Sequence, residues 1–471
     1  LVLFFLFVTS FLFSFYRLVS LCFMRLMNMS MSCFLLFFKQ KTSYEMLRSL
    51  VGSDMCIRYR NQTESPYYQQ EGSSFAYPMR YLDDALEYVR DARKIKDENG
   101  KYTNTDKKFE IILSGGTYYP MRNIKGEYVN SRGRTYLVPE GVTIVGGVET
   151  KQSDNNKDYT YYGNTAESSD NTTFTYGTST VVITHPGIKE IIKNRKLSDI
   201  NHNNIAEPWE MAVQTILSGQ VVNGNSNENV YHVIACIADE NHVGGLPEAT
   251  VKYYDSKSEK YDPQAGQGTV PYYKGEPVII DGVEIEDGTA MGYDATAVNS
   301  VYTYYKGGAI CVEGNWITNP TTNSGDYFQT YPGIDRPVGY RSIPLEVRNC
   351  NFRNNGGCLG GAIFTDSELK VFACNFVQNY AKVETDQIGT YAGRGGAINA
   401  SYNTVIVNSL FANNEADTSP SSGGSELRGV GGAVLLGEYA ALHMINCDVV
   451  RNLAYGYPAV YCYNANQRGT S

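Results

Sequence analysis

The chain has no surplus of positive charge. Its 471 residues include 40 Lys and Arg against 49 Asp and Glu, for a net charge of −9 at pH 7. Nucleic-acid-binding proteins present basic surfaces that displace counterions from phosphates, so this composition argues against a nucleic-acid partner. Charged residues make up only 19% of the chain and apolar residues 42%, which excludes a disordered chain. We expect a folded protein with a sizeable core.

The sequence also lacks the short motifs of common metal and cofactor sites. It contains no CxxC pair and no Cys/His spacing of a zinc site, and no GxGxxG or Walker pattern opens a helix. Seven cysteines lie beyond residue 60, and we interpret them as small buried side chains: Cys236, Cys311, Cys350, Cys358, Cys374, Cys447 and Cys462. We therefore expect no cofactor and no metal.

No apolar run is long enough to cross a bilayer. The longest uncharged run, Leu1 to Tyr16, has 16 residues, fewer than the roughly 18 to 20 of a membrane-spanning helix. Residues 37–58, which include FFKQKTSYEM and SLVGSDMCIR, resemble translated sequencing-adapter sequence. We interpret residues 1–60 as a non-native or disordered apolar segment, with a genuine membrane anchor as the alternative. We then expect contact with a membrane only through a segment that lies outside the native part of the chain, which begins after residue 60.

Beyond residue 60 the pattern changes to one helix followed by many short strands. Apolar residues at 82, 85, 86 and 89 have helical spacing, which predicts an amphipathic helix over 81–92 within an N-terminal cap region, 61–108. Short β-branched runs stopped by Gly or Pro follow at 109–120, 135–147, 180–184, 215–219, 230–238 and 277–288. The sequence therefore predicts an all-β region over 109–471.

An internal repeat of two interleaved motifs occupies the last third of the chain. The motif GGAI or GGAV begins at Gly307, Gly360, Gly395 and Gly431. The motif apolar-x-x-Asn begins at Phe352, Phe376, Phe411 and Val449. When the copies are aligned, like residues form columns, and successive columns lie two, three and two positions apart in the sequence. This spacing indicates short strands joined by a bend. We expect successive coils to pair in parallel at about 4.8 Å and to stack like residues in the core.

The last column of the alignment consists of asparagines, at Asn355, Asn379, Asn414 and Asn452. A buried carboxamide has two donor hydrogens and an acceptor oxygen, so it can satisfy backbone groups that turn inward at a bend. We predict that these residues form a structural Asn ladder. Catalysis is not expected of them, because Asn is neither an acid nor a base near neutral pH.

These interleaved motifs resemble the repeats of polymorphic outer-membrane proteins of bacteria. Residues 109–471 look like a right-handed single-stranded parallel β-helix, a solenoid of the pectin-lyase-like superfamily. The resemblance implies that the helix at 81–92 caps the N-terminal end, and that the protein is extracellular or on the outer cell surface of a bacterium. It implies little about activity, because this superfamily mixes enzymes with binding and structural proteins. A degenerate fifth coil ends near residue 460, so we expect the chain to be truncated at both ends.

The sequence contains few of the motifs that mark the enzymes of this superfamily. Polygalacturonase-type members carry NTD, DD, GHG and RIK in order. Here NTD occurs only at 104–106, DD only at 83–84 on the helix, and GHG is absent. A lyase would need acidic ligands facing an Arg, for which the candidates are Asp281, Glu284, Glu286 and Asp287 with Arg348, Arg353, Arg394 or Arg428. We interpret these acids as an exposed polar strand face, and assign no catalytic residue.

Recognition is the remaining kind of function. The insertion 313–343 carries aromatic residues that would stack on sugars, anchor a partner or pack on one another: Trp316, Tyr327, Phe328, Tyr331 and Tyr340. We predict a non-catalytic secreted or cell-surface protein for display, adhesion or glycan contact. Its partner would be an extracellular glycan or a surface protein of a host or neighbouring cell. The alternative is a polysaccharide lyase or glycoside hydrolase that acts on acidic polysaccharide in a groove.

Overall fold

The computed structural model describes 53–57, 79, 81–95, 97–98, 108–123, 126–129, 132–148, 150–152, 159–161, 169–176, 179–186, 213–221, 229–237, 249–254, 267–291, 305–317, 339–382, 393–417, 429–437, 440–455 and 458–462. All of these residues lie in one compact unit, Gly52–Ser471. The described part of this unit is predominantly β, with a single helix.

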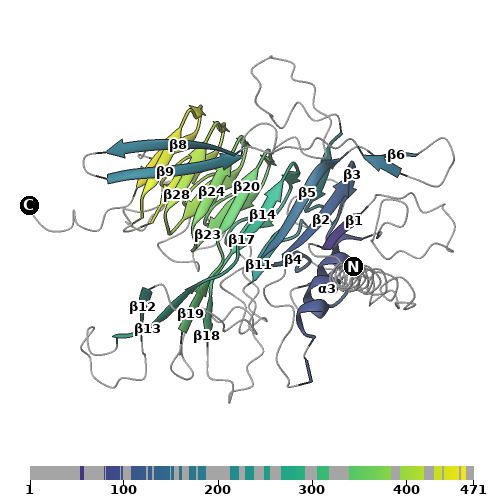
Figure 1. Cartoon of the computed structure of the whole chain (residues 1–471). Helices are drawn as coiled ribbons and strands as arrows, with labels where there is room; N and C mark the ends of the chain where they lie inside the picture. Colours follow the sequence, from purple (N-terminus) through teal and green to yellow (C-terminus); the bar gives the residue numbers. More distant parts are fainter. Residues whose placement is uncertain are drawn as a thin grey trace, which may run out of the picture. The chain divides into compact units, whose positions relative to one another are not determined.

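Most strands belong to four sheets in which every pair is parallel (Figure 1). In pairing order, sheet I contains β1 (Ser53–Ile57), β2 (Phe109–Ser114), β5 (Val142–Val148), β14 (Val278–Asp281), β20 (Leu345–Arg348), β24 (Leu369–Phe372), β28 (Thr404–Val407) and β32 (Leu442–Ile445). Sheet II contains β3 (Gly116–Tyr118), β10 (Thr215–Ser218), β15 (Glu284–Glu286), β21 (Asn351–Arg353), β25 (Asn375–Val377), β29 (Leu410–Ala412) and β33 (Asp448–Val450).

The other two parallel sheets are built from shorter strands. Sheet III contains β16 (Thr289–Ala290), β22 (Gly356–Gly357), β26 (Tyr380–Ala381), β30 (Glu415–Ala416) and β34 (Leu453–Ala454). Sheet IV contains β4 (Tyr136–Pro139), β11 (Ile234–Ile237), β17 (Ile310–Val312), β23 (Ile363–Thr365), β27 (Ile398–Ala400), β31 (Val434–Leu436) and β35 (Val460–Cys462).

The chain passes through the four sheets in a fixed order. Strands β20, β21, β22 and β23 lie in sheets I, II, III and IV, and β24–β27, β28–β31 and β32–β35 repeat that order. The register aligns the predicted columns, because Phe352 pairs with Phe376 and Phe376 with Phe411. The prediction of stacked parallel strands is confirmed, and the arrangement is compatible with a parallel β-helix.

Each coil bends where one residue adopts a left-handed backbone. Between sheets I and II these residues are Asn349, Ala373, Asn408 and Asn446, with φ between 49° and 51°. Between sheets II and III they are Asn354, Gln378, Asn413 and Arg451, with φ between 54° and 57°. Asn is the side chain that tolerates this region best after Gly, which explains its abundance at the bends. These bends produce the three-residue step in the sequence pattern.

The GGA motifs make a third bend, which requires glycine. Gly395 has φ of +67°, and a Cβ there would lie 2.2 Å from the carbonyl oxygen of Ile398. A Cβ on the next residue, Gly396, would lie 2.0 Å from the carbonyl oxygen of Gly432 in the following coil. The first glycine is therefore needed for its backbone angle, and the second for the close approach of neighbouring coils.

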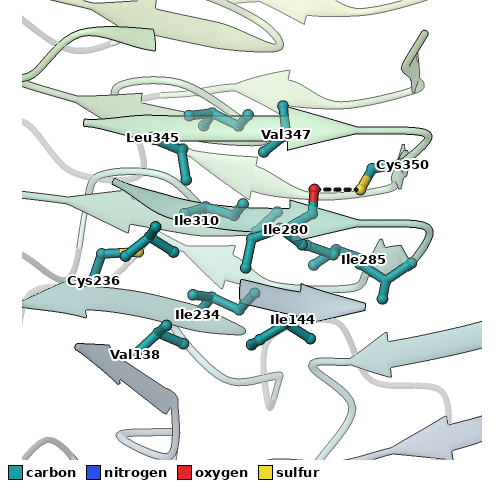
Figure 2. Close-up of a cluster of buried hydrophobic side chains, with 14 of the residues drawn as sticks. Val138, Ile144, Ile234, Cys236, Ile280, Ile285, Ile310, Leu345, Val347 and Cys350 are labelled. Atoms are coloured by element: carbon teal, nitrogen blue, oxygen red, sulfur yellow. Dashed lines mark hydrogen bonds between the residues drawn. The ribbon is translucent and has the colours of Figure 1, made fainter. Parts of the chain in front are cut away.

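The core lies between the sheets and consists of columns of like side chains. In sheet I, Ile144 pairs with Ile280 and Ile280 with Val347, and all three are fully buried. Figure 2 shows these residues with Ile234 and Ile310 of sheet IV in the same cluster. Burial of each such side chain contributes about 1.5–3 kcal/mol to the free energy of unfolding.

Aromatic rings form one of these columns. The ring centroids of Phe352 and Phe376 are 4.5 Å apart with an interplanar angle of 3°, and those of Phe376 and Phe411 are 4.7 Å apart at 1°. All three side chains are fully buried. The spacing matches the distance between neighbouring strands, so the rings stack because the coils stack.

The predicted helix is α3 (Leu82–Arg93), and its apolar side is buried in the same core. Asp83 and Asp84 lie in its first turn and Arg90 and Arg93 in its last, which suits the helix dipole. The Nη1 of Arg90 donates a hydrogen bond to the carbonyl oxygen of Leu137 in β4 at 3.2 Å. The helix therefore packs at the end of sheet IV.

Three smaller sheets lie outside this repeat. A mixed sheet has the order β12 (Ala249–Tyr254), β13 (Gln267–Lys274), β19 (Gly339–Ser342) and β18 (Asn315–Ile317). Two antiparallel pairs join β6 (Thr150–Gln152) with β7 (Tyr159–Tyr161) and β8 (Ser169–Tyr176) with β9 (Ser179–Pro186). The run predicted as a strand at 180–184 therefore lies in a hairpin and not in the parallel stack.

The division of the chain into the segments 1–60, 61–108 and 109–471 stays a prediction. Strand β1 falls within the segment 1–60 and pairs in parallel with β2. Within the described part of the chain, no helix combines the length and apolar content that a bilayer crossing requires.

Candidate functional site

The four asparagines of the predicted ladder are hydrogen-bonded to one another along the coils. The Nδ2 of Asn355 donates to the Oδ1 of Asn379 at 3.0 Å, that of Asn379 to Asn414 at 3.0 Å, and that of Asn414 to Asn452 at 2.8 Å. Three of the four side chains have no exposed surface, and Asn452 is partly buried. The ladder runs along the junction of sheets II and III.

Each carboxamide also satisfies the backbone at its bend. The Oδ1 of Asn379 accepts a second hydrogen bond from the backbone N–H of Asn355, at 3.1 Å. The Nδ2 of Asn379 donates to the carbonyl oxygen of Phe352 in the preceding coil, at 2.9 Å. All hydrogen-bonding groups of the Asn379 carboxamide are therefore used within the scaffold, which leaves it no capacity to contact a ligand.

A second column combines sulfur and oxygen atoms. The backbone N–H of Cys350 donates to the Sγ of Cys374 at 3.5 Å, and that of Cys374 donates to the Oγ of Ser409 at 3.1 Å. The thiol of Cys350 donates to the carbonyl oxygen of Ile280 at 3.5 Å (Figure 2). Burial raises the pKa of the Cys374 thiol well above its usual value. All seven cysteines beyond residue 60 belong to the described part of the chain and are free thiols.

Two of the aromatic residues predicted to form a binding loop, Trp316 and Tyr340, lie opposite each other on neighbouring strands. They are register partners in the antiparallel pair β18–β19. The neighbouring residue in β19, Arg341, makes a buried ion pair with Glu140, with 2.8 Å between Nη2 and Oε1. Tyr327, Phe328 and Tyr331 lie outside the described residues. The pairing brings two of the five residues together through their backbones.

The outward face of sheet II brings two acids of the predicted acidic group, Glu284 and Glu286, together with Arg353. The Nη2 of Arg353 lies 2.9 Å from the Oε1 of Glu284 and 2.6 Å from the Oε2 of Glu286. The two glutamates flank Ile285 on β15, and Arg353 is the register partner of Glu286 on β21. Because alternate residues of a strand share a face, the three charged side chains project outward while Ile285 points into the core.

Amide side chains extend this charged group in both directions. The Nδ2 of Asn375 donates to the Oδ1 of Asn351 at 3.0 Å. At the other end, the Nε2 of Gln220 donates to the Oδ2 of Asp287 at 2.8 Å. We call the surface made by all of these residues the Arg353 face: Gln220, Glu284, Glu286, Asp287, Asn351, Arg353 and Asn375.

Burial perturbs the acids of this face. Partial burial raises the pKa of Glu284, and the nearby Arg353 guanidinium opposes that rise. Partial burial also raises the pKa of Asp287, against the hydrogen bond from Gln220. The hydrogen bond to Glu286 raises the pKa of Arg353 above its usual value, so the guanidinium stays charged. The face therefore offers a fixed cation between carboxylates, together with amide donors and acceptors.

A pocket opens beside this face at the bend between sheets I and II. Its lining includes Gln214, Thr215, Glu284, Asn349 and Asn351, and its volume is about 10 Å³, which is room for about one water molecule. The side chain of Asn349 is buried. This pocket connects the bend to the charged row of the Arg353 face through Glu284.

The remaining acid and arginines of the lyase alternative lie off the Arg353 face. Asp281 of β14 is buried, and it is the register partner of Arg348 of β20 in sheet I. Arg348 pairs with Glu346 on its own strand, with 2.5 Å between Nε and Oε1. The backbone of Arg394 forms isolated parallel β-bridges with Leu359 and Val430. Arg428 lies outside the described residues. Among the described residues, no group of three or more His, Cys, Asp or Glu side chains is placed to hold a metal ion.

Sequence reasoning did not predict the convergence on Arg353, although a signal for it exists. Aligning Ile285 with Phe352 would have placed Glu284 opposite Asn351 and Glu286 opposite Arg353, as the structure has them. The pocket at Asn349 had no such signal, because Gln214 and Thr215 reach it from a distant part of the chain.

The chain matches no protein family model, no curated protein and no solved structure.

Proposed function

We propose that the chain is a right-handed parallel β-helix of the pectin-lyase-like kind, with repeats like those of polymorphic outer-membrane proteins. Three features support this: four parallel sheets visited in a fixed order, one-residue left-handed bends, and the Asn ladder. By the same resemblance the protein is exported and lies outside the cell or on the outer surface of a bacterium.

The function we propose is non-catalytic glycan contact, in the service of display or adhesion, through the Arg353 face. The observation that carries it is the guanidinium of Arg353 held between Glu284 and Glu286 on an outward sheet surface. Sugar hydroxyls both donate and accept hydrogen bonds, so rows of carboxylates, amides and a guanidinium match them. Because the side chains sit on paired strands, they are held in place before a ligand arrives, which lowers the entropic cost of binding.

A second candidate function is acid–base cleavage of an acidic polysaccharide. The raised pKa of Glu284 beside Arg353 favours it, because a carboxyl with a raised pKa is suited to act as a general acid. Against it, both glutamates are engaged by the same nitrogen of Arg353. Binding without turnover is therefore the function that this geometry supports best.

The test is binding of the purified chain to immobilised neutral and acidic glycans. We expect Arg353→Ala to lower the affinity at least tenfold, because it removes the central donor and leaves two like charges adjacent. Lys370→Ala is the matched control, since Lys370 is an exposed outward cation on sheet I. Equal binding by both variants and the wild type would refute the proposal.

Turnover is measured on the same samples. Formation of new reducing or unsaturated ends from polyuronides, abolished by Glu284→Gln, would replace the binding function by the catalytic one. Binding with no new ends supports the proposal.

A further inference from the structure

Tyr380 on the outer surface of sheet III lies over a glycine of the preceding coil. A Cβ on Gly356 would lie 2.5 Å from both Cε2 and Cζ of Tyr380 and 2.7 Å from its hydroxyl oxygen. The ring therefore covers Gly356, which is buried although it occupies an outward position of its strand. The residues in register at this position are Thr289, Gly356, Tyr380, Glu415 and Leu453. The repeat itself thus does not require an aromatic side chain here.

The inner side of the ring is held by packing. Met291 and Cys358 form a buried apolar cluster, and Tyr380 packs against it. Tyr380 itself stays partly exposed. Contact with this cluster and with Gly356 fixes the ring before a ligand arrives, so stacking on its exposed side costs little conformational entropy.

Polar and charged side chains lie on both sides of the ring along the strand. Asn354 and Gln378, the left-handed residues of the bend between sheets II and III, are both exposed. Beyond the ring, the Nζ of Lys382 lies 5.3 Å from the ring centre of Tyr380 and 3.5 Å from the Oε2 of Glu415. The side chain of Lys382 is 46% exposed. An apolar surface is therefore flanked by amide groups on one side and by an ammonium and a carboxylate on the other.

We propose that Tyr380 is a stacking platform for a pyranose ring whose hydroxyls are equatorial, such as a β-linked glucose residue. Such a sugar presents only C–H groups on its two faces, and the negative face of an aromatic ring attracts these polarised hydrogens. The hydroxyls at the rim of the stacked sugar reach Lys382, which donates hydrogen bonds, and Glu415, which accepts them.

This inference rests on the proposed glycan contact, which it extends from the Arg353 face to an aromatic subsite. Gly356, which lies under the ring, follows Arg353 by three positions on the same coil. The guanidinium and the ring therefore lie on adjacent surfaces, one on each side of the bend. Each can be removed without the other, so the two proposals are tested separately.

The test is titration calorimetry of the purified chain with cellotriose. Tyr380→Ala removes the platform, and we expect it to weaken binding about fivefold or more. Tyr380→Phe keeps the ring and removes only the hydroxyl, so it should bind like the wild type. Tyr119→Ala is the matched control, because Tyr119 is also exposed, at 46%, and follows β3 at the far end of sheet II.

Saturation-transfer NMR on the same samples gives a readout that a merely structural role would not move. Stacking brings the C–H groups of one sugar face closest to the protein, so we expect the strongest transfer to those hydrogens in the wild type and in Tyr380→Phe. We expect this preference to be lost in Tyr380→Ala.

The outcomes separate the platform from the wider proposal. Wild-type affinity in Tyr380→Ala, with loss of binding in Arg353→Ala, overturns the platform and leaves the Arg353 face standing. Equal weakening by Tyr380→Phe and Tyr380→Ala assigns the contact to the hydroxyl and also overturns stacking, as does equal weakening by Tyr119→Ala. Absence of saccharide binding by the wild type refutes both proposals. Tyr380→Leu, which keeps apolar bulk over Gly356 without an aromatic ring, replaces the alanine variant if that variant does not fold.

Discussion

The Oδ1 of Asn379 accepts two hydrogen bonds from Asn355, one from its backbone N–H at 3.1 Å and one from its Nδ2 at 3.0 Å. The two residues are 24 positions apart in sequence, yet neighbours in space. This contact fixes both the distance and the register of successive coils, because the acceptor is shared between a backbone and a side-chain donor.

Removal of a central ladder carboxamide is therefore expected to be costly. In Asn379→Ala, buried donors of Asn355 and the buried carbonyl oxygen of Phe352 lose their partner. We expect a loss of about 3 kcal/mol or more in the free energy of unfolding, measured by urea denaturation.

The last position of the ladder supplies the control. Asn452 is partly exposed, so water can replace the bonds lost in Asn452→Ala, and we expect a loss of only about 1 kcal/mol. A larger loss at position 452 than at 379 would contradict the view that burial sets the cost.

Glycine in the GGA motif is predicted to be irreplaceable. A Cβ at Gly395 meets the carbonyl oxygen of Ile398 at 2.2 Å, in addition to the strain of its positive φ. We expect Gly395→Ala to lower the free energy of unfolding by at least about 2 kcal/mol. Gly126 also has a positive φ, but the nearest atom to its Cβ, on Arg90, would be 3.7 Å away. Gly126→Ala should cost only about 1 kcal/mol, and equal losses would show that backbone angle alone matters.

Asp83 makes stability depend on pH through the docking of α3. Its Oδ1 accepts hydrogen bonds from the backbone N–H groups of Met121 and Arg122, at 3.3 and 3.2 Å. Burial raises its pKa from 3.8 to about 6 in the folded state. A carboxyl with a raised folded-state pKa destabilises the fold when it is charged, so stability is lowest above pH 6 and increases as the pH falls from about 6 to about 4.

Asp83→Asn should remove this dependence. Asparagine keeps the acceptor oxygen and carries no charge, so we expect it to stabilise the protein by about 1–3 kcal/mol at pH 7.5 and to have little effect at pH 4. Urea titrations at both pH values provide the measurement. Asp84→Asn, which removes a partly exposed ion pair with Arg122, should instead lose up to about 1 kcal/mol at pH 7.5. A uniform effect of Asp83→Asn at both pH values would disprove the linkage.

Thiol reactivity should follow burial. Cys462 is exposed, whereas Cys236 and Cys374 are fully buried and burial raises the pKa of both thiols. We expect iodoacetamide to alkylate Cys462 in the native protein and the other two only after unfolding, as followed by peptide mass mapping. Alkylation of Cys236 at the rate of Cys462 under native conditions would be inconsistent with a closed core.

The interior of the stack is readable from the sequence because it is periodic. Columns such as Phe352, Phe376 and Phe411 repeat at fixed distances from the GGA and Asn positions, so alignment alone places like residues together. The bends were visible as a three-residue step, although not their left-handed backbone. The Cys350 column was expected to be simply apolar, whereas its sulfur atoms also take part in hydrogen bonds.

The outer surface was less predictable because its contacts join segments with no common pattern. Arg353 meets Glu284 across two coils of unequal length, and Gln214, from a segment far away in the chain, lines the same pocket as Asn349. Likewise, no pattern in the sequence of the aromatic insertion predicted the antiparallel pairing of Trp316 with Tyr340. Such contacts depend on where each coil places its loops, which the repeat does not encode.

The hydrogen bonds between ladder asparagines span 24, 35 and 38 residues of chain, but their lengths stay between 2.8 and 3.0 Å. The extra residues of the longer coils enter mainly between sheets III and IV, after Lys382 and after Asp417. That corner accommodates additional polypeptide without altering the spacing of the layers. An epitope inserted between Lys382 and Gly393 should therefore leave the layer spacing unchanged, which makes this corner suitable for engineering the protein as a presentation scaffold.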